Sequence, residues 1–297
     1  MAIVSDNWAE LLLPGLRTIF DKHTEGFKDF VPVLFNVESS TKAQEFNLGV
    51  GSLGLMDEWG GTVSYEEFNK GYKSTYTHKK YSKGIQLERE LVDDDQYSEI
   101  KKRVKMLSQS VYYTRQIHAA SIFNNAFANG YAGPDGVALC SASHPNSPTD
   151  TTVQNNAGST ALDADAVEDT RTAMMGWKDD KGNLLYVNPD MLIVPTALRK
   201  TATIIAETKE EPFTTDHGVN IWAGGSLRII EMPFLTDTTN WFMVDSQRMK
   251  LFLQWYDRRK ADFSDDVDFD SEVAKYKVIA RHSFGFDDWS FIYGHAV

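Results

Sequence analysis

Three short segments of the chain carry residue types that bind ligands or react in other proteins, and the first is rich in glycine. Gly49, Gly51 and Gly54 fit the pattern G-x-G-x-x-G. That pattern holds a dinucleotide pyrophosphate when a buried strand precedes it and a helix follows it. Residues 56–61 lack a helical pattern, so we interpret the glycines as a hinge. A nucleotide-dependent enzyme that uses Gly49–Gly54 is the alternative from a different functional class.

Acidic residues at alternate positions near the C-terminus begin like a calcium-binding loop. Asp266, Asp268 and Asp270 have the spacing of its first three ligands. However, the sixth and twelfth positions hold serine and lysine, where the loop needs glycine and a bidentate glutamate. The sequence therefore predicts a solvated acidic turn over 262–270 and no metal site.

Cys140 and His144 are the third candidate, as a nucleophile and its base. They lie four residues apart, and spacing alone fixes no geometry in a loop. The sequence contains no H-E-x-x-H, zinc-binding Cys/His, G-x-S-x-G or Walker A pattern. We therefore predict no catalytic residue and no cofactor, and we expect the chain not to be an enzyme.

The balance of charges limits what the protein can bind. The chain has 297 residues, with 30 Lys and Arg against 42 Asp and Glu, and a formal net charge of −12. Affinity for phosphate backbones comes mainly from Lys and Arg, so we expect only loose contact with DNA. One cysteine permits no intramolecular disulfide, and no apolar run approaches the roughly 20 residues that cross a bilayer. No basic segment precedes an apolar stretch at the N-terminus, so we expect neither a secretory signal nor a membrane location.

The elements that would position these residues begin with two extended segments. Residues 1–40 are predicted to form an arm with a short helix broken by a Pro-Gly pair, and a terminal helix docked on its own domain is the alternative. Residues 41–88 are rich in glycine and contain a β-prone run, 72–81, in which Tyr72 and Tyr76 share one face. Because neither face of that run is strongly apolar, we expect a long hairpin that is stabilised by a partner chain, with an exposed edge hairpin as the alternative. We expect both segments to be mobile in the free subunit.

A long helix is the clearest predicted element. Apolar residues that step by three and four predict a helix from Gln96 to Ala128, about 50 Å long. Its apolar face consists of Tyr97, Ile100, Val104, Leu107 and Val111. Asp93–Asp95 are expected to cap its start, and Asn129 and Gly130 to end it. A helix of this length is expected to form the spine of its domain.

A second unit of helices and strands is predicted after a loop-rich segment, 130–160. Asp163 is placed to cap a helix that runs to about Trp177. Met191–Val194 is wholly apolar and predicts a buried strand, after which Pro195 opens another helix. The further predicted strands are Leu227–Glu231, Trp241–Val244, Lys275–His282 and Ser290–Tyr293.

The order of these elements resembles that of the major capsid proteins of tailed bacteriophages, and it is most similar to the Mu-like major head subunits. The most specific similarity lies after the long helix, where residues 135–145 are similar to the stretch D-G-x-x-L-(F/C)-S-x-S-H-P of these subunits. The matching residues include Asp135, Gly136, Ser143, His144 and Pro145. Residues 191–195, 241–245 and 275–281 add weaker similarity.

The resemblance implies an α+β chain with the capsid fold that is called the Hong Kong 97 type. Its implied parts are an N-terminal arm at 1–40, an E-loop at 41–88, the spine helix and loop of a peripheral domain at 89–154, an axial domain at 155–240 and the C-terminal strands of the peripheral domain at 241–297. A subunit that fits both five- and six-fold rings needs hinges, which glycines supply. The residues expected to serve assembly are Gly49, Gly51, Gly54, Trp59, Gly60, Gly61, Tyr72 and Tyr76.

The implied function is that of a structural subunit of an icosahedral phage head, which assembles in the cytoplasm of the host bacterium and becomes part of the virion. Its implied partners are copies of itself in hexamers and pentamers, a portal, decoration proteins where they are used, and packaged double-stranded DNA that it contacts loosely. Because the arm-like segment starts almost at Met1, we expect scaffolding to come from a separate protein. An encapsulin-like compartment shell with the same fold is the alternative.

Overall fold

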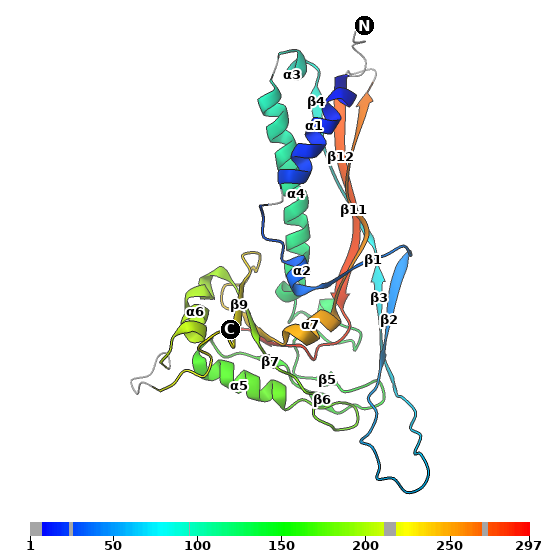
Figure 1. Ribbon diagram of the computed structural model, residues 1–297, viewed down its shortest axis with the longest axis vertical. Helices are drawn as coiled ribbons and strands as arrows, with labels where there is room; N and C mark the ends of the chain where they lie inside the picture. The colour runs from blue at the N-terminus through cyan, green and yellow to red at the C-terminus, as the bar shows by residue number, and fades with distance from the viewer. Residues whose placement is uncertain (1–7, 24–25, 95, 211–217, 269–272) are drawn as a thin grey trace.

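Two β-sheets and the helices that cover them make up the body of the subunit. The computed structural model describes residues 8–23, 26–94, 96–210, 218–268 and 273–297. In Figure 1 helix α4 and one sheet form a long, narrow part, and the second sheet and its helices form a broader base. The helices and the two separate sheets confirm the predicted α+β class.

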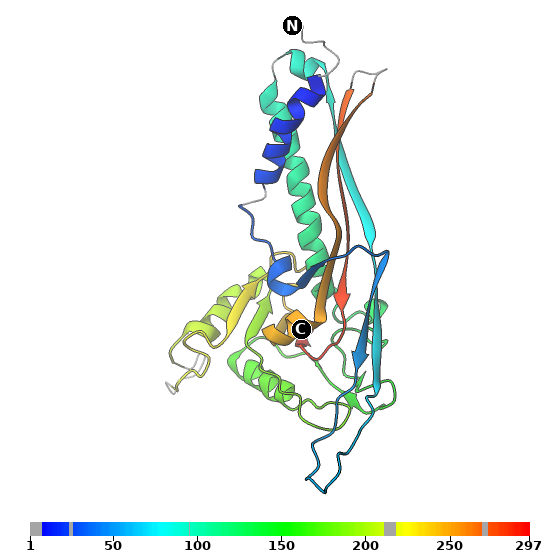
Figure 2. The ribbon, with the colours of Figure 1, turned by 45° about the vertical axis from the view of Figure 1, so that its right-hand side comes forward.

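The sheet of the narrow part has the strand order β1-β11-β12-β4. Its strands are β1 (Asn36–Ser39), β4 (Lys79–Glu88), β11 (Leu253–Asp268) and β12 (Val273–Phe286). Helices α4 (Tyr97–Asn124) and α1 (Trp8–His23) lie on this sheet in both views (Figures 1 and 2). The core between helices and sheet contains Leu16, Phe20, Leu87, Ile100, Val104, Leu107, Phe263, Ala274, Tyr276 and Val278. This shared core makes the sheet and the two helices one packed unit.

Helix α1 corrects the expectation of a broken, undocked arm helix. It continues through Pro14 as far as His23. Leu16 and Phe20 are buried against α4 and the sheet, and the Phe20 and Phe263 rings stack at 5.3 Å. Burying two large apolar side chains stabilises the helix by about 1.5–3 kcal/mol each, which offsets the backbone hydrogen bond that a proline removes. The alternative of a terminal helix docked on its own domain is therefore the observed one, and residues 1–7 lie outside the described part of the chain.

Helix α4 confirms most of the predicted apolar face but has different ends. Ile100, Val104 and Leu107 are buried and Val111 is half-buried, whereas Tyr97 is 38% exposed at the first residue of the helix. The helix begins after Gln96, whose side chain makes no capping hydrogen bond. The expected acidic cap is therefore wrong for Asp93, which ends the short helix α3 (Glu90–Asp93), while Asp95 lies outside the described residues.

The C-terminal end of α4 comes four residues earlier than predicted. The helix ends at Asn124, and Asn129 and Gly130 belong to the separate 3-10 turn η2 (Asn129–Tyr131). The carbonyl of Ala126 accepts a hydrogen bond of 2.8 Å from the backbone N–H of Cys140. A distant segment therefore takes the acceptor that a longer helix would have used.

The sheet of the base has the strand order β7-β13-β10-β8-β9. Its strands are β7 (Ala157–Gly158), β8 (Met191–Val194), β9 (Arg228–Glu231), β10 (Trp241–Val244) and β13 (Ile292–His295). All residues of β8 and β10 are buried, as their apolar sequences predict. The helices of the base are α5 (Ala164–Met175), η3 (Thr196–Leu198) and α6 (Arg199–Glu207), and α2 (Val31–Leu34) and α7 (Ser246–Phe252) lie where base and narrow part meet. Asp163 caps α5 as predicted, because its side chain accepts a hydrogen bond from the backbone N–H of Ala166.

The C-terminal range 241–297 contributes to both sheets, in contrast to its expected place in the peripheral domain alone. β10 and β13 pair with each other in the sheet of the base, and only β11 and β12 extend the narrow part. The predicted acidic turn at 262–270 is also wrong as far as Asp268, because β11 continues through it and pairs with β12. Phe263 anchors this part of the strand in the core, and residues 269–272 lie outside the described chain.

A hairpin projects past the base, at the lower right of Figure 1. Its antiparallel strands are β2 (Gln44–Val50) and β3 (Lys70–Thr77), and residues 51–69 between them form an irregular loop. The predicted β-prone run 72–81 is split at His78, because β3 pairs with β2 whereas β4 pairs with β12. We call residues 51–69 the extended loop.

Candidate assembly surfaces

The extended loop exposes most of its apolar side chains. Met56 is 98% exposed, Tyr65 92% and Trp59 71%. The other exposed apolar residues of the loop are Leu53, Leu55, Val63 and Phe68. A soluble protein rarely presents so much apolar surface on one segment unless another molecule covers it. The loop is therefore the strongest candidate for a surface that binds a partner.

The glycines of the loop do not form a nucleotide site. Gly49 lies in β2, and Gly51 and Gly54 begin an irregular segment, so no helix follows them within residues 49–69. The helix N-terminus that would face a pyrophosphate is missing from this part of the chain, which removes the geometric basis for a nucleotide-dependent enzyme at this site. Gly60 has open space around its Cα, and Gly61 has a φ of 99°, which favours glycine over other residues. Their role in assembly stays a prediction.

One face of β3 packs on its own chain, which corrects the expectation that the whole hairpin depends on a partner. Ser74 and Tyr76 are buried and Tyr72 is half-buried, and His78, which directly follows the strand, is buried as well. The Tyr76 hydroxyl donates a hydrogen bond of 2.6 Å to Asp287. Burial first, and the nearby Asp287 carboxylate second, raise the pKa of Tyr76 far above its usual value. The root of the hairpin is therefore part of the folded body.

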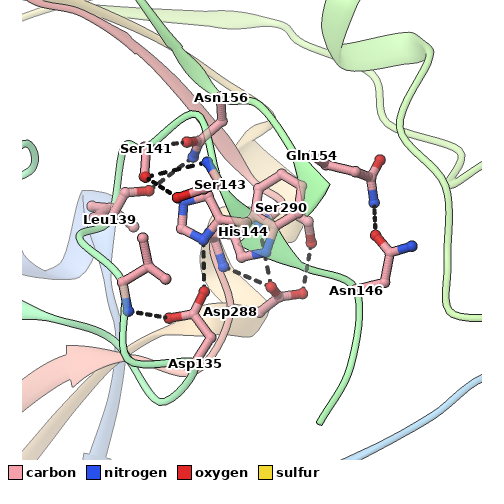
Figure 3. Close-up of polar contacts among 12 residues, drawn as sticks. Asp135, Leu139, Ser141, Ser143, His144, Asn146, Gln154, Asn156, Asp288 and Ser290 are labelled. Carbon is pink, nitrogen blue, oxygen red and sulfur yellow. Dashed lines mark hydrogen bonds and ion pairs between the residues drawn. The ribbon is translucent and has the colours of Figure 1, made fainter. Parts of the chain in front are cut away.

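The residues of the family-like segment gather around a buried histidine (Figure 3). His144 is fully buried, its Nδ1 lies 2.6 Å from the Asp135 carboxylate, and its ring stacks on Trp289 at 4.6 Å. Gly136 has a φ of 81° in the turn that brings Asp135 to this position. The exposed Ser143 and the strand β5 (His144–Pro145) continue the segment toward β6 (Val153–Gln154). These contacts close a loop onto the base of the subunit.

Asn156 is a key residue of this cluster that the sequence analysis did not single out. It is fully buried, and its side-chain oxygen accepts a hydrogen bond of 2.7 Å from the N–H of Ser141. Its amide nitrogen donates to the carbonyls of Leu139 at 2.8 Å and Ile292 at 3.1 Å. One side chain thus joins the family-like segment to strand β13. Its position in a polar Ser, Thr and Asn stretch gave no local signal of this role.

The cluster has no reactive thiol. Cys140 is buried, and burial raises the pKa of its thiol well above the usual value, so the thiolate form is disfavoured. The possible base, His144, is held by Asp135 and stacked on Trp289. Among the described residues no group of three or more His, Cys, Asp and Glu is arranged to hold a metal ion, and no described helix is long and apolar enough to cross a membrane. The contacts of Cys140 and His144 therefore pack the family-like segment onto the base.

Two histidines join the spine helix to its sheet. Nδ1 of His118 in α4 lies 2.9 Å from Nε2 of His282 in β12. Tyr81 packs against both rings at 4.6 Å, and Trp255 stacks on His282 at 4.7 Å. Burial, and the neighbouring His118 charge, lower the pKa of His282 to about 4. A cavity of about 640 Å³, partly lined by Tyr81 and His282, lies beside this contact.

A long helix on a four-stranded sheet, a second sheet in the base and a projecting hairpin together define a shell protein of the Hong Kong 97 type. The procapsid subunit of bacteriophage JBD30 has this fold, with a TM-score of 0.57 and 13% identity over 99% of this chain and 76% of that chain. The mature capsid of bacteriophage PhiM1 gives a TM-score of 0.55 at 11% identity, over 88% of this chain and 84% of that one. A virus-like particle from Pyrococcus furiosus gives 0.51 at 9% identity, over 95% and 98%.

The family follows from the sequence. The model of a phage capsid protein family matches residues 71–294, and the chain belongs to this family. No curated protein matches the chain. The protein is thus a structural head subunit that assembles with copies of itself into a capsid shell and is located in the virion. The predicted resemblance to phage capsid proteins is confirmed, while membership of the Mu-like branch stays a prediction.

Proposed function

We propose that copies of this chain form hexamers and pentamers, which close into an icosahedral head around double-stranded DNA in the host cytoplasm. The observation that carries the proposal is the extended loop, whose apolar side chains find no cover on their own subunit. Met56 and Tyr65 are more than nine-tenths exposed. Since the chain belongs to a family of shell proteins, the cover is best supplied by a second copy.

Charge favours one arrangement of the loop between copies. The extended loop contains Asp57, Glu58, Glu66 and Glu67 and no lysine or arginine. Exposed lysines lie on β4 and on the first turns of α4: Lys79, Lys80, Lys83, Lys101, Lys102 and Lys105. We therefore place the loop of one copy on the α4 and β4 surface of the next. Such a contact joins two different surfaces, and head-to-tail contacts of this kind close into rings.

The parts of the subunit then take different places in a ring. The narrow part, with α4, carries the surface that receives the loop, so it belongs at the periphery of each hexamer or pentamer. The base, built from 155–240 with β10 and β13, belongs near the axis of the ring. The expected hinge residues, Gly49 to Gly61, would let one sequence fit both kinds of ring.

Other partners follow from the shell function and from charge. A scaffolding protein, a portal and, in some heads, decoration proteins are the partners of such a shell. The net charge of −12 keeps packaged DNA from binding the wall tightly. Retention of DNA would therefore depend on enclosure, and the shell would bind free DNA weakly even at low salt.

The test compares the full chain with a loop variant by electron microscopy and light scattering. The double substitution Leu55→Ser and Trp59→Ser removes apolar surface from exposed positions, so it should leave the subunit folded. The matched control, Leu55→Met with Trp59→Phe, keeps that surface apolar. We expect closed shells, or rings of five and six, from the natural chain and the control when each is expressed with the other head proteins.

The serine variant should give monomers of normal stability under the same conditions. Shells of natural size from the serine variant would show that the loop does not hold the copies together. A natural chain that stays monomeric even when it is expressed with the other head proteins would contradict the proposal as a whole. Shells filled with a cargo enzyme in place of DNA would support the encapsulin-like alternative.

A further inference from the structure

The projecting hairpin is fixed to the body at two separate places. Near its root, Asp287 accepts hydrogen bonds from Tyr76 at 2.6 Å and from Asn47 at 2.7 Å. Farther along, where the extended loop begins, a turn of the base at 178–184 contacts both of its ends. A segment that is held at one point can swing, whereas two points fix its direction.

The turn at 178–184 is held in shape by contacts among its own residues. Lys178 and Leu184 form a β-bridge, and Gly182 has a φ of 82°, which suits glycine. The Asp179 side chain accepts hydrogen bonds from the backbone N–H groups of Lys181 at 2.9 Å and Asn183 at 2.8 Å. Asp179 thus holds the turn closed and leaves the next residue, Asp180, at its tip.

Asp180 holds both ends of the extended loop with one carboxylate. Its Oδ1 accepts a hydrogen bond of 2.9 Å from the N–H of Ser52, and its Oδ2 accepts one of 3.0 Å from the side chain of Asn69. Gly51 makes this approach possible, because a Cβ at that position would lie 2.5 Å from the Asp180 Oδ2 atom. The backbone N–H of Gly51 also donates to the carbonyl of Asn69 at 2.9 Å. The two ends of the loop are thereby tied to each other and to the base.

An ion pair adds a second contact beside Asp180. Lys181 Nζ lies 2.5 Å from one oxygen of Glu66, and the other oxygen accepts a hydrogen bond of 2.8 Å from the N–H of Gly54. The hydrogen bond from Lys181 lowers the pKa of the Glu66 carboxyl, so the pair stays charged near neutral pH. Because the pair is exposed, it adds little to the stability of the subunit. Its role is to orient the extended loop relative to the turn at 178–184.

We infer that the Asp180–Lys181 turn is a latch that sets the direction of the extended loop in the free subunit, before a neighbouring copy binds it. The inference rests on the proposed function, in which the loop must point toward the neighbouring copy that it binds. Between the two anchors the strands have a register shift at Leu48 and Val50. There Gly49 and Gly71 pack so closely that a Cβ at Gly71 would lie 2.4 Å from the Gly49 carbonyl carbon. This pair without side chains is the pivot about which an unlatched loop would turn.

Amide hydrogen exchange of the free, full-length subunit tests the latch without any assembly step. The variant is Asp180→Ala, and the control is Asp169→Ala, which removes an exposed carboxylate from α5 in the same part of the molecule. Loss of two hydrogen bonds is expected to speed exchange at residues 51–54 and 66–69 by roughly tenfold or more. Exchange in β2 and β3 near Asp287 should not change. Equal exchange of the loop in both variants would overturn the inference.

Swapping the charges of Lys181 and Glu66 tests whether the ion pair itself orients the loop, or whether the variants only lose packing. Lys181→Glu alone should place the loop beside a repelling charge and speed exchange at Gly51 and Ser52, whose N–H groups donate to Asn69 and Asp180. Adding Glu66→Lys restores an opposite pair and should slow exchange at Gly51 and Ser52 again toward the natural value. Gly54 should exchange fast in this double variant, because its N–H loses the Glu66 acceptor. Failure of the rescue at Gly51 and Ser52 would argue against the ion pair as part of the latch. Shells or rings of altered size from Asp180→Ala, with normal shells from the control, would link the latch to assembly. The hydrogen-exchange results could fit the latch in a chain that never assembles into shells or rings. That outcome would reject the proposed function but would still support the latch.

Discussion

The hydroxyl of Tyr76 donates a hydrogen bond of 2.6 Å to the carboxylate of Asp287, two residues that lie 211 positions apart in the chain. The bond ties β3 of the hairpin to the segment that follows β12. Tyr76 also packs on Tyr256, with ring centroids 5.2 Å apart. The root of the hairpin is therefore anchored to the main sheet through Tyr76, although β2 and β3 form a separate two-stranded sheet.

Tyr76→Phe should weaken the subunit because it removes the donor and leaves a charged acceptor with one hydrogen bond fewer. We expect the free energy of unfolding in urea to fall by about 1.5–3 kcal/mol. Tyr65→Phe is the matched control, since Tyr65 is 92% exposed, and it should change stability by less than about 0.5 kcal/mol. Equal stability of the two variants would mean that the Tyr76 bond does not anchor the hairpin.

Asn156→Ala should be among the most damaging polar substitutions in the base. It leaves the Ser141 N–H and the carbonyls of Leu139 and Ile292 without their side-chain partner. We expect a loss of about 2–4 kcal/mol in the free energy of unfolding. Asn129→Ala, at an exposed position, should cost little. A small change in the free energy of unfolding for Asn156→Ala would show that the family-like segment packs on the base without the Asn156 hydrogen bonds.

Acid should destabilise the subunit through His282. Its pKa falls from 6.5 to about 4 on folding, because burial and the His118 charge disfavour the imidazolium. Between these two pH values the unfolded state binds more protons at His282 than the folded state does. The stability that the neutral His282 contributes to the folded subunit is therefore fully present above pH 6.5 and is lost as the pH falls toward 4. The expected loss from His282 is about 2 kcal/mol between pH 7 and pH 5, measured by urea unfolding.

The variant His282→Gln should flatten part of this pH dependence. Burial also lowers the pKa of His295 to about 4, so His295→Gln should flatten a further part. The double variant is expected to vary least between pH 7 and pH 5. An unchanged slope in the double variant would place the acid sensitivity elsewhere in the chain.

Cys140 should be inert in the folded subunit. The thiol is buried and its pKa is raised, so little thiolate forms and reagents cannot reach it. We expect a disulfide reagent at pH 8 to react at least about 100-fold more slowly with the native chain than with the chain in urea. Similar rates in both states would reopen the case for Cys140 as a nucleophile.

Local patterns were sufficient where a short run of residues specifies its own environment. Met191–Val194 is wholly apolar, and such a run has no stable place except inside a sheet that is covered on both faces. Ile100, Val104 and Leu107 recur at the helical period and are all buried. Asp163 caps α5 through an N–H three residues away. In each case the deciding contacts, or the period that predicts them, lie within one or two turns.

Periodicity shows which side of an element is apolar, but not how far its partner surface extends. Tyr97 continues the apolar face of α4 and is nevertheless exposed. Pro14 looked like a helix breaker, yet burial of Leu16 and Phe20 keeps α1 intact. The run 72–81 looked like one strand, although its two halves pair with different partners.

The main helices and strands, and the lack of a known catalytic motif in the sequence, could be read from residue types and spacing, and the family from the resemblance of residues 135–145 and of the element order to phage capsid proteins. The functions of Asn156, Asp180 and Asp287 could not, because each holds segments between 15 and 240 residues distant through hydrogen bonds that have no local period. A polar side chain in a loop has the same sequence signature whether water or a buried amide is its partner. Only the folding of the chain, which removes water and brings the distant groups within hydrogen-bonding distance, determines which of the two it is.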